Sequence, residues 1–248
     1  YLPIIKKNSR YFNTSRRGAE LIKYASNAFL ASKISFINEM ANLCEKAGVD
    51  IKDVSLGMGS DQRIGDRFLR AGPAYGGSCF PKDTRALINI GNKFNTNLSI
   101  VKSVVNSNEN RKTLLIKRVE KILNHKFKNK IITFLGVTFK PNTDDMREAS
   151  SIPMIKYLNK KNSKIRYYDP SGEKDDFKGL KNVNYCSTIS SACLKADLVI
   201  LHTEWNDFKL LDFKQLIKKK RFKIYDLRNL YSTSKMKKLN INYFSIGR

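Results

Sequence analysis

The hydrophobic residues of this 248-residue chain change their spacing once, near residues 127–130. Before that point, apolar side chains recur every three or four residues, first from Ala19 to Ala47 and again from Ser99 to about Leu123. This spacing is typical of long amphipathic helices. After it, short continuous apolar runs alternate with helix-like segments. The change predicts a helical first part followed by a domain with a buried parallel sheet.

Glycine, proline and aspartate mark the expected helix ends in the first part. Gly48 is placed to end the first helix, and Asp50 is placed to cap the next one. The glycine-rich segment 57–77 predicts a loop. Pro81 fits the first position of a further helix that runs towards residue 90.

The second part alternates strands and helices. The predicted strands are residues 131–137, 164–168, 197–202, 222–227 and 242–246, with helices at 153–158, 187–194 and 212–219. This alternation favours an α/β fold with a doubly wound, Rossmann-like parallel sheet. We therefore expect an all-helical central domain at 1–108, a connecting helix at 109–128 and an α/β domain at 129–248.

The dinucleotide-binding fingerprint, a strand that leads into G-x-G-x-x-G, does not occur in the sequence. Gly57 and Gly59 have the first spacing, but Gln62 stands where the pattern requires its third glycine, and Arg63 follows it. The chain also begins with Tyr1 and has no signal-peptide layout. We therefore expect it to begin inside a longer protein.

The chain carries 47 lysines and arginines against 22 acidic residues, a net charge of +25. Such an excess can attract nucleic acid or another polyanion. The lysines are spread along the whole chain, which favours a solvated basic surface. The functional alternative is an anionic substrate drawn by long-range attraction. We therefore expect no nucleic-acid partner, and no apolar run is long enough to predict a membrane span.

Cysteines and histidines are few and scattered. The four cysteines form no C-x-x-C pair, and the two histidines lie far apart in the sequence. This pattern argues against a metal site. Reduced thiols in a cytoplasmic protein fit it best.

The segment 76–83, Gly-Gly-Ser-Cys-Phe-Pro-Lys-Asp, is the best candidate for chemistry. Its glycines allow close backbone approach to a ligand. Cys79 falls just ahead of a predicted helix start, where the helix dipole and the nearby Lys82 favour a thiolate. Asp83 follows one helical turn later. A lone cysteine is otherwise often a buried small apolar residue, and that alternative stays open here.

Several segments resemble the UDP-glucose/GDP-mannose dehydrogenase family, and they occur in the family's order along nearly the whole chain. They are residues 19–30 (AELIKYASNAFL), 61–65 (DQRIG), 75–84 (YGGSCFPKDT), 136–140 (GVTFK), 145–151 (DMREASS), 168–170 (YDP), 203–205 (TEW) and 226–229 (DLRN). The segment 78–84 is most similar to the UDP-glucose branch. The chain resembles the central and C-terminal domains of that family, so we expect the N-terminal NAD-binding domain to lie outside it.

The resemblance implies a four-electron oxidation of a nucleotide-sugar alcohol to a carboxylate, with two NAD reduced. It implies that Cys79 attacks the intermediate aldehyde to give a thiohemiacetal, which is oxidised to a thioester and hydrolysed. Lys23 and Asn27 lie one helical turn apart, hence on one face of a helix. The resemblance places both at the reacting carbon and implies that Asp83 acts through water in proton removal and hydrolysis.

The resemblance also implies contacts with the substrate and the cofactor. The implied substrate contacts are Lys23, Tyr24, Asn27, Arg63, Phe68, Arg70, Tyr75, Gly76, Phe139, Lys140 and Arg228. Arg63 is expected to reach the substrate site of a neighbouring subunit, which implies a homodimer or a larger homo-oligomer. Arg147 and Cys79 are expected to contact NAD. Ala74 and Arg70 depart from the glycine and lysine that many relatives carry, and an Arg keeps the charge but changes the geometry.

These implications predict a UDP-sugar enzyme that makes UDP-glucuronate, with the present chain inactive by itself. GDP-mannose or a UDP-N-acetyl sugar is the alternative substrate within the family. A non-catalytic basic module that binds nucleic acid is the alternative from another class of protein.

Overall fold

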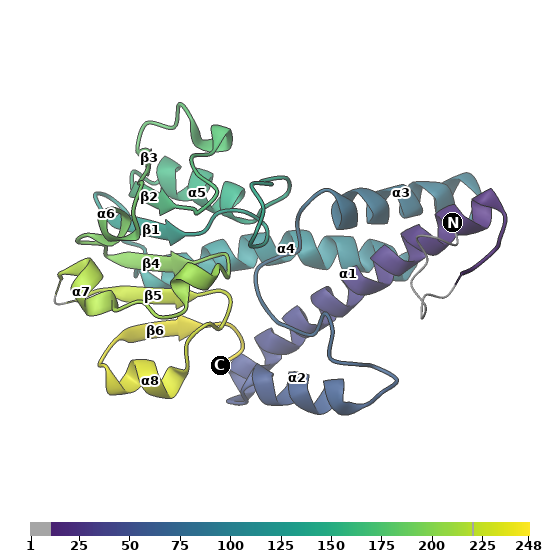
Figure 1. The fold of residues 1–248 in the computed structure, drawn as a ribbon, viewed down its shortest axis with the longest axis horizontal. Coiled ribbons are helices and arrows are strands. Elements are labelled where there is room, and N and C mark those ends of the chain that lie inside the picture. The colour runs from purple at the N-terminus through teal and green to yellow at the C-terminus, as the bar shows by residue number, and fades with distance from the viewer. Residues whose placement is uncertain (1–10, 220) are drawn as a thin grey trace.

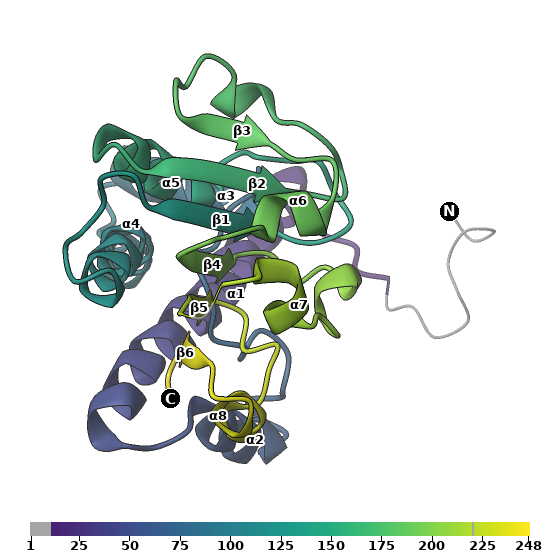
Figure 2. The same ribbon diagram turned by 90° about the vertical axis from the view of Figure 1, so that its left-hand side faces the viewer.

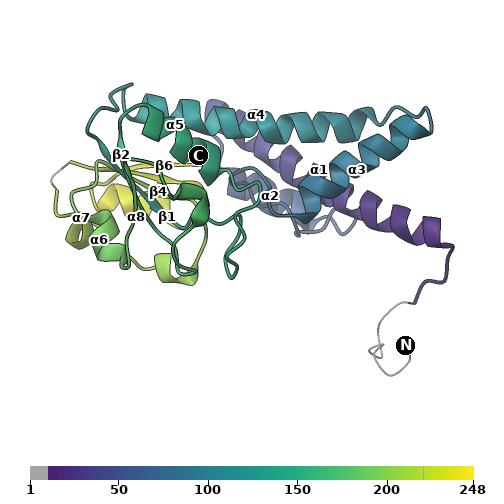
Figure 3. The same cartoon turned by 90° about the horizontal axis from the view of Figure 1, so that it is seen from above.

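The computed structural model describes residues 11–219 and 221–248, and it has a helical lobe and an α/β lobe (Figure 1). The helical lobe contains α1 (Arg16–Ala47), α2 (Ile51–Ser60), α3 (Cys79–Lys93) and the first half of α4 (Ser99–Ile122). Figure 3 shows α4 running along the length of the molecule, from α1 and α3 to the sheet. No helix among the described residues combines the length and apolarity needed to cross a membrane.

The ends of α1 and α2 follow the predicted signals. Ser15 caps α1 by accepting a hydrogen bond from the Gly18 N–H group. Gly48 ends α1 in the left-handed conformation, with φ of 70°, and its N–H group donates to the Cys44 carbonyl. Asp50 then caps α2, as predicted, by accepting from the Lys52 N–H group. These caps set the sharp turn between the two helices.

Two details of the predicted helical lobe are wrong. Helix α2 continues through Gly57 and Gly59 to Ser60, because apolar residues on its inner side pack against the main core, so the loop begins later than predicted. Helix α3 begins at Cys79, so Cys79 lies inside the helix and Pro81 occupies its third position. A proline is tolerated there because the first N–H groups of a helix have no partner within it.

The α/β lobe is a six-stranded parallel sheet in the order β3-β2-β1-β4-β5-β6. The strands are β1 (Ile131–Leu135), β2 (Lys164–Tyr168), β3 (Val183–Tyr185), β4 (Leu198–Leu201), β5 (Lys223–Asp226) and β6 (Asn242–Ser245). The helices are α5 (Ser151–Lys160), α6 (Ile189–Cys193), α7 (Phe213–Ile217) and α8 (Thr233–Lys238), with 3₁₀ turns at Asp175–Phe177 and Asn206–Phe208. This arrangement confirms the predicted α/β class and doubly wound sheet.

Helices cover both faces of the sheet. Figure 2 shows α4 and α5 on one face and α6 and α7 on the other. Ile132 and Phe134 on β1 point into the core shared with α4 and α5, whereas Leu135 packs in the core beneath α6 and α7. β1 is therefore buried on both sides, as its continuous apolar run predicts.

Two elements escaped the sequence prediction. β3 has only three residues and none of them is buried, so it lacks an apolar run. α8 has the sequence TSKMKK, and its one buried residue is Met236. Helix α4 is continuous across residue 108 and ends at Ile122, and its buried face enters both lobes. The division of the chain at residues 108 and 128 stays a prediction.

The carboxyl ends of the parallel strands meet the helical lobe at one seam. The segments after β1, β4 and β5 lie at the same edge of the sheet because all three strands run in one direction. Residues 66–78 of the helical lobe pass along this edge and lead into α3. The seam brings together residues that are up to 194 positions apart in the sequence, from Ile34 to Arg228.

Candidate active site

A buried carboxylate ties α3 to α1 next to the seam. Asp83 is fully buried, and its Oδ2 atom accepts hydrogen bonds from Lys23 Nζ at 2.8 Å and from Asn27 Nδ2 at 2.6 Å. The Lys82 Nζ atom lies 3.3 Å from the other carboxylate oxygen. Lys23 and Asn27 thus reach one carboxylate from the same face of α1, as their spacing predicts.

These contacts keep Asp83 ionised. Burial alone would raise the pKa of Asp83, but hydrogen bonds from Lys23, Asn27 and Lys82 outweigh it and hold the pKa below the ordinary value. The same bond to Asp83 raises the pKa of Lys23. The cluster therefore favours an ammonium next to a carboxylate.

Cys79 is exposed at the first position of α3. Its Sγ atom lies 3.7 Å from the Ser78 Oγ atom. Cys44 and Cys193 are buried, and Cys186 is intermediate, so Cys79 is the one exposed thiol of the four. The alternative that Cys79 is a buried apolar residue is wrong.

A cavity of about 590 Å³ occupies the seam between the two lobes. Seven predicted substrate residues line it: Phe68, Arg70, Tyr75, Gly76, Phe139, Lys140 and Arg228. Asp66, Arg67, Phe80 and Glu204 also line it, although the sequence analysis assigned them no role. The Phe80 ring makes edge contacts with Phe68 and Tyr75, at centroid distances of 6.1 and 6.0 Å. The lining therefore combines an aromatic cluster with basic side chains.

Arg228 is the basic residue of this cavity that is anchored to the segments following the sheet strands. Its Nε atom lies 2.8 Å from a Glu204 carboxylate oxygen and donates to the His202 carbonyl at 2.9 Å. Its Nη2 atom donates to the Phe139 carbonyl at 3.0 Å. Burial lowers the pKa of Arg228, yet a guanidinium remains charged at neutral pH. The fixed charge of Arg228 and the exposed Lys140 face an anionic ligand.

Other predicted residues lie outside this cavity. Tyr24 is half-buried on α1, with the Lys23 Nζ atom 5.8 Å from its ring centroid. Arg63 is 89% exposed and pairs with Asp61 at 2.6 Å, pointing to solvent within this subunit. Arg147 pairs with Asp145 at 2.8 Å and is also exposed. Only Lys23 and Asn27 of the predicted residues outside the cavity contact Asp83 directly.

A second cavity, of about 800 Å³, lies beside Ser78 and the first turn of α3. Its basic residues are Lys82, Arg85, Lys112 and Arg147, and its acidic residue is Glu148. Glu148 accepts from Arg85 and Lys112, at 2.9 and 3.0 Å. The remaining positive charge suits the diphosphate of a dinucleotide. Among residues 11–219 and 221–248, no group of three or more side chains is arranged to hold a metal ion.

Comparison with known proteins identifies both lobes. Residues 17–110 match the central domain of the UDP-glucose/GDP-mannose dehydrogenase family, and residues 133–233 match that family's UDP binding domain. The chain is 42% identical, over its whole length, to the UDP-glucose 6-dehydrogenase of Rickettsia felis. It covers 56% of that relative. It is 45% identical over 96% of its length to a Bacillus subtilis UDP-glucose 6-dehydrogenase, of which it covers 54%. The chain thus spans just over half the length of these relatives.

Solved structures show the same fold. A UDP-glucose dehydrogenase from Pyrobaculum islandicum superposes with a TM-score of 0.79 at 34% identity, over 88% of this chain and 49% of that one. A UDP-D-ManNAc dehydrogenase from Pyrococcus horikoshii superposes with a TM-score of 0.82 over 97% of this chain and 54% of that one. Its identity is 23%, so it supports the fold alone.

We expect Asp83→Asn to reduce the loss of unfolding free energy that occurs as the pH falls. The folded pKa of Asp83 lies below its ordinary value of 3.8, so the ionised carboxylate stabilises the fold above that value. This contribution is lost as the pH falls through the lower folded pKa. Urea unfolding from about pH 5 to about pH 2 should show a smaller loss of stability for the variant than for wild type. Asp144→Asn, at an exposed loop position, is the control and should follow wild type. Parallel wild-type and Asp83→Asn profiles would contradict this role.

Proposed function

Because the chain belongs to the UDP-glucose/GDP-mannose dehydrogenase family, we propose that it binds the substrate and carries the nucleophile of an NAD-dependent enzyme that oxidises UDP-glucose to UDP-glucuronate. One observation carries the proposal. The buried Asp83 gathers Lys23 and Asn27 one helical turn from the exposed Cys79, beside a cavity lined by aromatic and basic side chains. The names of the relatives that match all or nearly all of the chain favour UDP-glucose within the family.

The residues around Cys79 divide the proposed chemistry. NAD, when bound, accepts a hydride in each of the two oxidations. The Cys79 sulfur adds to the aldehyde carbon: a C–S bond forms, the C=O π bond opens, and the oxygen takes the thiol proton to give a thiohemiacetal. Loss of a hydride from its carbon to the cofactor and of the hydroxyl proton to water would leave the thioester. Water then breaks the C–S bond, releases the carboxylate and returns the thiol. The Lys23 ammonium and the Asn27 amide stabilise negative charge on the sugar oxygen. Asp83 directs the water and accepts its proton.

The seam cavity is proposed to hold the nucleotide. Arg228, Lys140 and Arg70 supply positive charge for the diphosphate. The rings of Phe68, Tyr75 and Phe80 pack edge to face and give the cavity an apolar aromatic surface suited to a base and a sugar. This division of charge and aromatic surface supports a nucleotide sugar over an extended nucleic acid.

The second cavity is proposed to face the cofactor. Arg147 was expected to contact NAD, and it lines this cavity together with Lys82 and Arg85. The hydrogen bond with Asp145 raises the pKa of Arg147, so its guanidinium stays charged where it lines this cavity. These residues fit a diphosphate next to the reacting cysteine.

The four free cysteines support the expected cytoplasmic location, where thiols stay reduced.

A homodimer through α1 is proposed from an exposed apolar stripe on that helix. The stripe consists of Ile22, Phe29, Phe36 and Leu43, which recur every seven residues and are all exposed. A seven-residue repeat keeps one face of a helix turned towards a second helix. Large exposed apolar surfaces mark interaction sites in soluble proteins. Arg63 points outward while paired with Asp61, and the family resemblance implies that it enters a partner's site.

UDP-glucose should bind this chain, and Lys140→Ala should weaken binding about tenfold, because a contact between two charged groups is lost. Isothermal titration calorimetry measures both affinities. Lys161→Ala is the matched control, since each lysine lies 5.4 Å from the centroid of a neighbouring ring and only Lys140 lines the cavity. Equal affinities for the two variants would contradict the proposed site. Tighter binding of GDP-mannose or a UDP-N-acetyl sugar than of UDP-glucose would overturn the substrate assignment.

The 28.5-kDa chain should sediment as a dimer, and Phe36→Asp should shift it to a monomer by placing a charge in the apolar stripe. Sedimentation velocity measures both states. Leu210→Asp introduces the same charge at a residue that is 90% exposed and far from α1, and it should leave the dimer intact. A wild-type monomer, or a Phe36→Asp dimer, would refute the α1 interface.

A further inference from the structure

The loop from Gly72 to Gly76 forms one wall of the substrate cavity and is packed tightly against the α/β lobe. A Cβ atom at Gly76 would lie 2.7 Å from the Glu148 carbonyl oxygen, so no larger residue fits there. A Cβ atom at Gly72 would lie 3.3 Å from the Leu227 carbonyl oxygen. Directly after the loop, the Gly77 N–H group donates to the Arg147 carbonyl at 2.7 Å. This face of the loop is therefore fixed by close backbone contact.

Two buried asparagines hold the opposite face of the loop. Asn108 on α4 makes a pair of bonds with the backbone of Tyr75: its Oδ1 accepts from the N–H group at 2.8 Å, and its Nδ2 donates to the carbonyl at 3.1 Å. Asn38 on α1 accepts from the Gly72 N–H group at 2.9 Å and donates to the Pro73 carbonyl at 3.4 Å. Each asparagine thus pairs with loop backbone as a neighbouring strand would.

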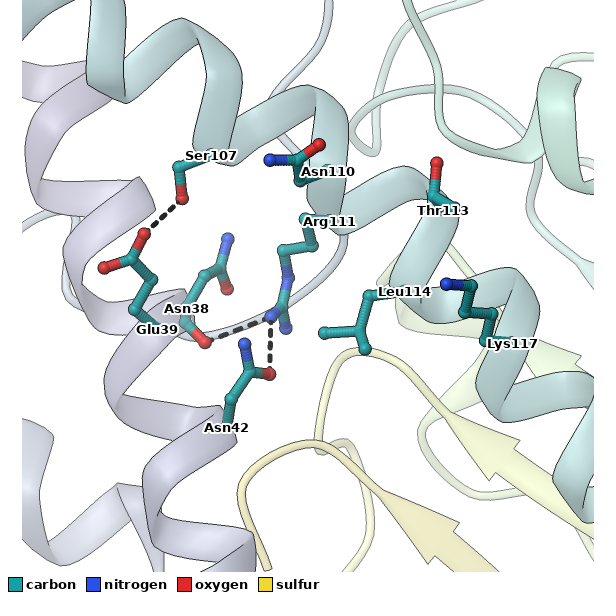
Figure 4. Close-up of a pocket in the computed structure, with 9 residues that line it drawn as sticks. All are labelled: Asn38, Glu39, Asn42, Ser107, Asn110, Arg111, Thr113, Leu114 and Lys117. Atoms are coloured by element: carbon teal, nitrogen blue, oxygen red, sulfur yellow. Dashed lines mark hydrogen bonds between the residues drawn. The ribbon is translucent and has the colours of Figure 1, made fainter.

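Arg111 joins these asparagines at the back of the loop. Its Nε atom donates to the Gly72 carbonyl at 2.8 Å, and its Nη1 atom donates to the Asn38 carbonyl and to Asn42 Oδ1, at 3.0 and 3.2 Å. Figure 4 shows its guanidinium between Asn38 and Asn42, at the wall of a cavity of about 410 Å³ between α1 and α4. This cavity lies on the side of the loop away from the substrate cavity, and the two cavities share no lining residue.

The burial of Arg111 is costly. Its side chain is 4% exposed, and no carboxylate lies within ion-pair distance of it in the part of the chain that the structure describes. Burial lowers the pKa of Arg111 to about 10. A buried charge held only by neutral oxygens stabilises a fold less than apolar packing of the same volume would. The role of Arg111 therefore lies in the groups that its hydrogen bonds hold. These are the loop and the helix that carries Asn38.

We propose that Asn38, Asn108 and Arg111 are positioning residues that hold the Gly72–Gly76 loop in the shape that receives the nucleotide sugar. This inference rests on the proposed function. A glycine-rich loop is mobile when free, so ordering it on binding would cost conformational entropy and weaken the affinity for the ligand. A loop that is already held from both sides loses little conformational entropy when the ligand binds. The clamp also fixes the position of Cys79, which begins α3 three residues after the loop.

Asn108→Leu tests the clamp because it removes both bonds to Tyr75 and keeps a similar volume. We expect its Kd for UDP-glucose to rise about tenfold or more, and the Tyr75 amide to lose its protection from hydrogen exchange while the amides of α4 keep theirs. Calorimetry measures the affinity and NMR measures the exchange. Asn38→Ala is the second variant and should expose the Gly72 amide in the same way, if Asn108→Leu fails to fold.

Leu115→Ala is the matched control. Leu115 is fully buried on the same helix as Asn108 and does not line the substrate cavity, so this variant should lower the melting temperature with the Kd unchanged. An unchanged Kd for both asparagine variants, or a rise in Kd equal to that of Leu115→Ala, would overturn the clamp. A wild-type chain that does not bind UDP-glucose would instead overturn the proposed function, and this inference with it.

Discussion

A buried carboxylate stays ionised only where donors reach it, and this constraint organises the site. Asp83 sits in the first turns of α3, and the donors that hold its charge, Lys23 and Asn27, come from α1. The cluster therefore fixes the rotation of α3 against α1. Because Cys79 is one turn earlier on the same helix, that rotation also sets the position of the sulfur. An ion cluster that ties two helices together thus also places the proposed nucleophile.

The α/β lobe supplies the rest of the site through its topology. Parallel strands end at one edge, so Phe139, Lys140 and Arg228 arrive together although they follow different strands. The glycines after Ala71 let the helical lobe approach that edge at backbone distance. The substrate cavity consequently belongs to both lobes, and α4, which enters the core of each, keeps them in register.

Much of the fold could be predicted from the spacing of the apolar residues in the sequence. The three- and four-residue periodicity predicted α1 and α4, and the apolar runs predicted five strands of the sheet, because those patterns come from burial of one helix face or of both strand faces. β3 and α8 bury too little to leave a pattern. The site is only partly readable. The four-residue spacing of Lys23 and Asn27 predicted that they share one face of a helix. Asn38, Asn108 and Arg111 look in the sequence like ordinary polar residues of a helix, because only tertiary packing buries them.

The account depends on the substrate cavity and Cys79 being one site, and thiol alkylation with and without ligand tests this directly. Iodoacetamide labelling followed by mass spectrometry gives the rate at each cysteine. We expect Cys79 to react fastest in the free protein, and saturating UDP-glucose to slow its labelling while the half-buried Cys186 keeps its rate. A Cys79 rate that is the same with and without bound UDP-glucose would separate the sulfur from the cavity and contradict the account.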